Sequence, residues 1–66
     1  MKSDINVKLI EGYLSDNNLT KSSFCKKCRI ATSTYEKILN NNFERNIIAL
    51  CKIAHQMDMH ISEMFI

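Results

Sequence analysis

The sequence contains no proline, no tryptophan and a single glycine, Gly12. Strands and hairpins need many more turn residues than this, so the scarcity argues against a β-rich fold. Long apolar runs are also missing, since the longest covers residues 47–51 and a membrane-spanning helix needs about 20. No apolar stretch follows the charged residues at 1–4, so no signal peptide is predicted. We therefore expect a helical, cytoplasmic protein that does not enter a membrane.

The composition is that of an ordinary globular chain. Of its 66 residues, 45% are hydrophobic and 24% are charged, which fits one domain over residues 1–66 and not a disordered segment. The net charge is only +2, but residues 20–37 hold five Lys or Arg against Glu36 alone, whereas the remainder holds four basic and six acidic residues. Such a concentration suits phosphate binding, and it is equally typical of a solvent-facing helix.

Apolar side chains recur at three- and four-residue spacing, which predicts five helices. They are expected over residues 5–17, about eight residues after the N-cap Thr20, 32–39, 47–57 after the N-cap Asn46, and 61–65. Asn17 and Asn18 should end the first of them. The side chains expected to face inward are Leu9, Ile10, Tyr13, Leu14, Phe24, Cys25, Cys28, Tyr35, Ile38, Leu39, Ile47, Leu50, Cys51, Ala54, Met57, Ile61, Met64 and Phe65.

The second and third predicted helices are short, and about three residues join them. The third would turn small polar side chains and a lysine outward, namely Thr32, Ser33, Glu36 and Lys37. A pair of short helices with this spacing is typical of a helix-turn-helix.

Over residues 10–65, and without gaps, the sequence resembles the Cro/C1-type (XRE-type) helix-turn-helix family of bacterial and phage transcriptional regulators. The likeness is carried by Leu19-Thr20, by Ile30, Ser33-Thr34 and Ile38, by Asn46-Ile47, by the run LCKIAHQMDM at 50–59 and by ISEMF at 61–65. None of these pieces is specific by itself, but their order is. The resemblance implies an all-α, five-helix, lambda-repressor-like domain.

The resemblance also implies roles for individual residues. Thr32, Ser33 and Lys37 match the positions that read bases, and their hydroxyl and ammonium groups can bond to base edges. The positions that hold phosphates are matched by Thr20, Lys21, Asn40, Asn42 and Arg45. Thr20 and Lys21 open a helix, where unpaired N–H groups and the dipole favour an anion. The alternative for Thr32 and Ser33 is that they do no more than open the third helix.

Two residues depart from the family pattern at the turn. Arg29 stands where the family commonly has glycine, and it would be strained by about 1 kcal/mol if its φ is positive. Ala31 replaces the serine or threonine that usually caps the third helix. Because alanine cannot cap, we expect the cap to shift to Thr32, which would move the base-reading register by one residue.

The three cysteines allow more than one interpretation. Cys25 and Cys28 form a CxxC, and Cys51 precedes His55 by one helical turn, so the four could in principle bind zinc. However, all three cysteines fall on predicted inner faces, His55 is expected to face solvent, and free cysteine is among the most buried residue types. A redox-sensing thiol is a third alternative. We favour buried, reduced thiols and expect no metal and no cofactor.

The function expected from the resemblance is sequence-specific binding of double-stranded DNA by a small transcriptional repressor. A homodimer would be usual for this motif, with a dimer face around Met59, Met64 and Ile66. The alternative is a protein-interaction module or antitoxin component of the same fold, with weak or no DNA binding of its own. No nucleophile–base pair, paired carboxylates or phosphate loop is visible, so we expect neither an enzyme nor a small-molecule substrate.

Overall fold

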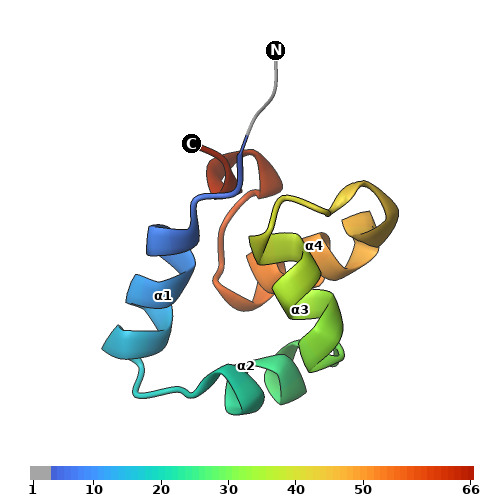
Figure 1. The fold of residues 1–66 in the computed structure, drawn as a ribbon. Coiled ribbons are helices and arrows are strands. Elements are labelled where there is room, and N and C mark those ends of the chain that lie inside the picture. The colour runs from blue at the N-terminus through green and yellow to red at the C-terminus, as the bar shows by residue number, and fades with distance from the viewer. Residues whose placement is uncertain (1–3) are drawn as a thin grey trace.

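A computed structural model describes residues 4–66, most of which are helical (Figure 1). In chain order the elements are α1 (Val7–Asp16), α2 (Lys21–Cys28), α3 (Thr32–Leu39), the 3₁₀ helix η1 (Glu44–Asn46), α4 (Ile47–Gln56) and the 3₁₀ helix η2 (Ile61–Met64). Residues 4–66 contain no β-strand, and the all-α class predicted from the sequence is confirmed. Among these helices, none combines the length and the apolar character needed to cross a membrane.

Asparagines set both ends of α1. The Asn6 side chain accepts a hydrogen bond from the Leu9 N–H at 3.2 Å, so the helix begins at Val7 rather than at Ile5. At the other end, the Asn17 N–H donates to the Tyr13 carbonyl, and Asn18 has a φ of 54°. Asparagine tolerates this left-handed conformation better than most residues. The prediction that the asparagine pair ends the helix is confirmed.

Residues 4–6 form a segment, here called the strap, that is hydrogen-bonded to the C-terminal residues 64–66. The Asn6 N–H donates to the Met64 carbonyl and the Ile66 N–H donates to the Asp4 carbonyl, each at 2.8 Å. Figure 1 shows the first described residues running beside the C-terminal segment. Ile5 is buried in the core and forms an isolated bridge with Phe65. Placing Ile5 in the first helix was therefore wrong, because its backbone bonds to other segments instead.

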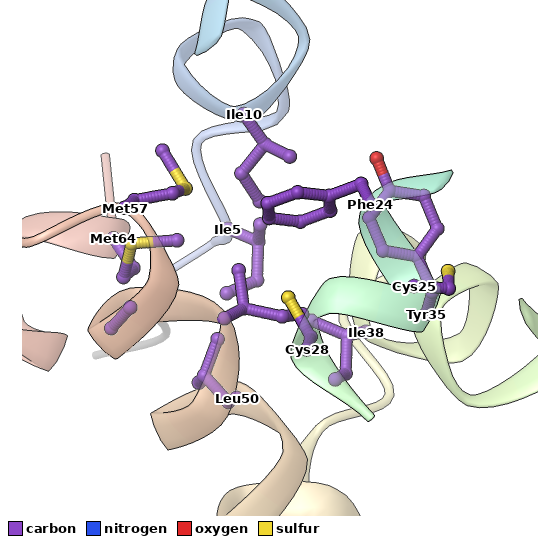
Figure 2. Close-up of a cluster of buried hydrophobic side chains, with 12 residues drawn as sticks. Ile5, Ile10, Phe24, Cys25, Cys28, Tyr35, Ile38, Leu50, Met57 and Met64 are labelled. Carbon is purple, nitrogen blue, oxygen red and sulfur yellow. The ribbon is translucent and has the colours of Figure 1, made fainter. Parts of the chain in front are cut away.

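One continuous apolar core joins the strap and the helices (Figure 2). Its largest fully buried side chains are Ile10, Phe24, Tyr35, Ile38, Leu50, Ile53 and Met64. The Phe24 ring lies 5.7 Å from Tyr13 and 6.0 Å from Tyr35 between centroids, so aromatic contacts link α1, α2 and α3. Burying each large side chain of this kind contributes about 1.5–3 kcal/mol. The inward faces predicted for the first three helices are confirmed.

The inward face of α4 differs from the prediction. Leu50, Ile53, Ala54 and Met57 are buried, whereas Ile47 and Cys51 are exposed. The buried set follows the spacing of zero, three, four and seven residues that defines one helical stripe. The predicted set has nearly the same spacing but lies roughly 45° further around the helix. Both stripes are apolar, so the choice between them was made by packing of α4 against α2, α3 and η2.

The C-terminal element is a 3₁₀ helix where a fifth α-helix was expected. The Glu63 carboxylate accepts a hydrogen bond from the His60 N–H at 2.9 Å, and the His60 ring accepts one from the Ser62 N–H at 3.2 Å. These bonds close a tight turn, after which Phe65 leaves in extended conformation to meet Ile5. The described residues thus contain four α-helices and two 3₁₀ helices, and η1 was not predicted.

Candidate nucleic-acid interface

The start of α2 is capped as the sequence predicted. The Thr20 hydroxyl accepts a hydrogen bond from the Ser23 N–H at 3.1 Å and lies 2.9 Å from the Ser23 hydroxyl. The N–H groups of Lys21 and Ser22, ahead of Ser23, have no partner within a helix. Thr20 and Lys21 are exposed. The beginning of α2 therefore presents N–H groups, a hydroxyl and a lysine to solvent.

An ion pair connects the start of α2 with the outer surface of α3. Lys21 Nζ lies 2.8 Å from Glu36 Oε1, and the two side chains are 49% and 53% exposed. The hydrogen bond to Glu36 and its negative charge raise the pKa of Lys21. Pairing with Glu36 was not predicted, although Glu36 is the one acidic residue in the basic stretch 20–37. The pair holds Lys21 against the exposed side of α3, where the Glu36 carboxylate offsets the charge of the lysine.

Residues 29–31 join α2 to α3 through a left-handed turn. Arg29 has φ 60° and ψ 45°, and the Ile30 N–H donates to the Cys25 carbonyl at 3.0 Å. This is the backbone conformation that favours glycine, so the expected strain at Arg29 is present. The turn keeps glycine-like geometry without a glycine.

The first turn of α3 begins directly after Ala31, without the shift expected from the lack of a capping side chain there. The helix starts at Thr32, and Ala31 is its N-cap in extended conformation with no side-chain hydrogen bond. The expected shift of the cap to Thr32 does not occur, because the Ala31 carbonyl already accepts from the Tyr35 N–H at 3.1 Å. The register of α3 is therefore defined, and its first N–H groups have no side-chain cap.

The three predicted base-reading residues share the exposed side of α3. Thr32, Ser33 and Lys37 are all exposed, and Tyr35 and Ile38 on the other side are buried. Burial raises the pKa of the Cys25 thiol on the preceding helix, α2. Within residues 4–66, the side chains of Thr32, Ser33 and Lys37 make no hydrogen bond and no ion pair.

The asparagines after α3 form hydrogen bonds that stabilise the backbone around them. Asn40 Nδ2 donates to the Glu36 carbonyl at 2.9 Å, and the Asn42 N–H donates to the Lys37 carbonyl at 2.8 Å. Between them, Asn41 has a φ of 67°, and its Oδ1 accepts from the Ile5 N–H at 2.8 Å. Asn40 and Asn42 remain exposed, so a phosphate contact is sterically open to both. The role of Asn41 in holding the strap was not predicted.

The basic side chains do not all lie on one surface. Lys21 lies against α3 through Glu36, and Lys37 belongs to α3 itself. Lys27 and Arg29 line a different surface, a hollow shared with Lys52 of α4. Arg45, a predicted phosphate contact, is exposed on η1 and lines a hollow beside Ala31 and Thr34. The structure therefore brings some of the predicted cations to the α3 side and sends others toward α4.

The cysteines do not gather into one site. Cys25 and Cys28 are both buried in the core (Figure 2), while Cys51 is exposed. Burial raises the pKa of the Cys28 thiol to about 11. The inward prediction for Cys51 was wrong, because α4 is rotated toward Ile53. Within residues 4–66, no three His, Cys, Asp or Glu side chains are grouped so that they could hold a metal ion.

The predicted dimer face is only partly accessible. Met64 is completely buried and Met59 is half-buried, whereas Ile66 is 84% exposed. Met64 was therefore wrongly assigned to a dimer face, because it fills the core beneath the strap. Ile66 remains available on this side of the molecule.

No family model, curated protein or solved structure matches the chain. The resemblance to Cro/C1-type regulators therefore depends on the residue pattern alone.

Proposed function

We propose that the chain is a sequence-specific DNA-binding transcriptional regulator, a small repressor in which α2 and α3 act as a helix-turn-helix. In this proposal α3 enters the major groove of double-stranded DNA and α2 lies across the backbone. We place the chain with the Cro/C1-type family as a single cytoplasmic, lambda-repressor-like domain. The observation that carries the proposal is the exposed row of Thr32, Ser33 and Lys37 on a helix whose opposite side is buried in the core.

The proposal divides the contacts into two kinds. Thr32, Ser33 and Lys37 would reach base edges, with the lysine donating to guanine N7 or O6. The phosphate contacts would come from Thr20, Lys21, Asn40, Asn42 and Arg45. The exposed N–H groups at the start of α2 would donate hydrogen bonds to a phosphate oxygen. Lys21 would exchange its bond to Glu36 for a phosphate, which an exposed ion pair allows because it is worth little in water.

Selection from a random double-stranded DNA pool, followed by fluorescence anisotropy on the enriched duplex, tests this function. We expect a palindromic site bound by a homodimer, and an affinity that falls steeply with salt because phosphate contacts release counterions. Lys37→Ala should lower affinity about tenfold and relax the base preference at one position. Arg45→Ala should weaken binding to all sequences and reduce the salt slope.

Lys8 offers a matched control, since it is an exposed lysine on α1 and borders a hollow that includes Met57 and Met59 but no residue of α2 or α3. Lys8→Ala should leave the affinity unchanged. If no sequence is enriched, or if binding ignores salt, the DNA proposal is wrong. The chain would then be better described as an interaction module or antitoxin component of the same fold.

A further inference from the structure

The first turns of α4 leave large apolar side chains in solvent. Ile47 is 46% exposed and Ile48 is 72% exposed, and Cys51 is exposed one turn later. Together with Ile66, these two isoleucines are the large apolar side chains that residues 4–66 expose most. Neighbouring apolar side chains at the surface mark binding sites more often than isolated ones do.

These side chains lie between two hollows. The larger, about 540 Å³, separates Lys27 and Arg29 at the end of α2 from Ile48, Cys51 and Lys52 on α4. The smaller, about 310 Å³, lies between the start of α3 and the start of α4, and it includes Arg45, Ile47 and Ile48. Ile48 and Lys52 line both hollows, so the two lie next to each other along α4. We call the combined surface the α4 groove.

The charges around the α4 groove all have one sign. Lys27, Arg29, Arg45 and Lys52 line it, and among residues 4–66 no Asp or Glu does. A symmetric dimer that pairs this surface with the same surface of a second copy would bring like charges together, which is unfavourable. A nucleic-acid backbone would match the charge but leave the isoleucines uncovered. A peptide with both apolar and acidic side chains satisfies both features.

We propose that the α4 groove binds an acidic amphipathic segment of a partner protein. The apolar side chains of that segment cover Ile47, Ile48 and Cys51, and its carboxylates meet the surrounding lysines and arginines. The groove shares Arg45 with the proposed phosphate contacts, whereas the proposed base-reading residues Thr32, Ser33 and Lys37 line neither hollow. Peptide binding to the groove can therefore be tested in the absence of DNA.

The test uses a synthetic helical peptide with leucines at spacings of three and four residues and glutamates at the other positions. The control peptide has lysine in place of every glutamate. With ¹⁵N-labelled full-length protein, we expect saturable shifts at the end of α2, the start of α3 and the first half of α4 with the glutamate peptide only. Cys51 is the exposed one of the three thiols, so its alkylation by iodoacetamide should slow as the peptide binds.

Variants at exposed positions keep the fold and locate the site. Ile48→Asp should weaken the glutamate peptide at least about tenfold, since it removes apolar contact and adds repulsion. Lys52→Glu should also weaken it. Ile66→Asp is the matched control, because Ile66 is 84% exposed and lines neither hollow, and it should have no effect.

Several results would overturn the proposal. The proposal is wrong if the glutamate peptide shows no saturable binding up to millimolar concentration, or if the lysine peptide binds as tightly as the glutamate peptide. It is also wrong if Ile66→Asp weakens binding of the glutamate peptide as much as Ile48→Asp does. Sedimentation that shows self-association abolished by Ile48→Asp would assign the groove to a second copy. Shifts centred on Ile48 when a DNA duplex is added would assign it to nucleic acid.

Discussion

Arg29 occupies a conformation that glycine adopts without strain. Its φ of 60° places the side chain against its own backbone, which raises the energy of an L-residue by about 1 kcal/mol or more. The Arg29 guanidinium does not offset this strain, because it is exposed and forms no ion pair within residues 4–66. Arg29 lies in the α4 groove, so its charge has a use there that glycine could not supply.

Arg29→Gly should therefore stabilise the protein by about 0.5–1 kcal/mol, the relief of strain being partly offset by the greater chain entropy of glycine. Urea unfolding followed by circular dichroism measures this. Arg29→Ala is the matched control, because it removes the same charge but keeps the strained conformation. If the alanine variant is stabilised as much as the glycine variant, charge and not backbone strain is responsible.

At the scale of elements, the two helices of the proposed DNA surface differ in how they begin. Thr20 caps α2 through its hydroxyl, whereas Ala31 caps α3 without any side-chain bond. Ala31 nevertheless has φ −75° and ψ 147°, the extended geometry that suits a capping threonine. The backbone at position 31 could therefore accommodate a capping side chain, and α3 lacks the stabilisation that such a cap would give.

Replacing Ala31 by threonine should add about 1 kcal/mol of stability through a new cap. In a domain of this size that corresponds to a rise in Tm of about 4–8 °C. Ala31→Val has nearly the same shape but no hydrogen-bond acceptor, so it should show no gain. Thermal unfolding of the two variants compares them directly, and equal Tm values would exclude capping as the cause.

The α4 helix shows where periodicity stops being decisive. Ile47, Ile48, Leu50, Cys51, Ile53, Ala54 and Met57 are all apolar. More than one set of them has the spacing of a helical face, so the sequence admits two rotations of the helix. One face of the helix cannot bury all of these apolar residues, so the sequence indicates that some of them are exposed. Contacts with other elements decide which residues are exposed.

At the scale of the whole molecule, one asparagine connects three distant segments. Asn41 follows α3, has a positive φ, and accepts a hydrogen bond from the N–H of Ile5, which itself pairs with Phe65. Phe65 in turn lies 5.3 Å from Phe43 between ring centroids. The strap, the loop after α3 and the C-terminal segment therefore form one unit.

Asn41→Gly keeps the backbone conformation unstrained but removes the acceptor. We expect a loss of about 1 kcal/mol or more, because the Ile5 N–H is left in a partly buried place without a partner. Asn41→Asp retains an acceptor and should be close to the original protein. Hydrogen exchange provides the specific measurement, since the Ile5 amide should lose protection in the glycine variant and keep it in the aspartate variant. Equal protection in both would show that this bond does not hold the strap.

Stability should fall in alkaline solution. Burial raises the pKa of Cys28 from 9.0 to about 11 and that of Tyr35 from 10.0 to about 12. The unfolded chain therefore loses these protons at lower pH than the folded protein does. The stability linked to these two groups is fully present below pH about 9 and is lost as the pH rises to about 12.

Urea unfolding between pH 8 and about 11.5 tests this window. Tyr35→Phe is the matched variant, because it keeps the ring in the core and removes the ionisable hydroxyl. It should lose less stability than the original protein in the upper part of the range. Identical pH profiles would mean that lysine titration or another group dominates the alkaline loss.

The sequence by itself determined the helical class, the end of α1 at Asn17 and Asn18, the cap of α2 at Thr20, the inward faces of the first three helices and the exposed row on α3. These features depend on neighbours within one or two helical turns, so residue spacing is enough to predict them. Tertiary structure decided the rotation of α4, the strap around Ile5, the Lys21–Glu36 pair and the division of the basic residues between two surfaces. Each of these depends on contacts between residues distant in sequence, whose free energies are set by packing and cannot be obtained from local spacing.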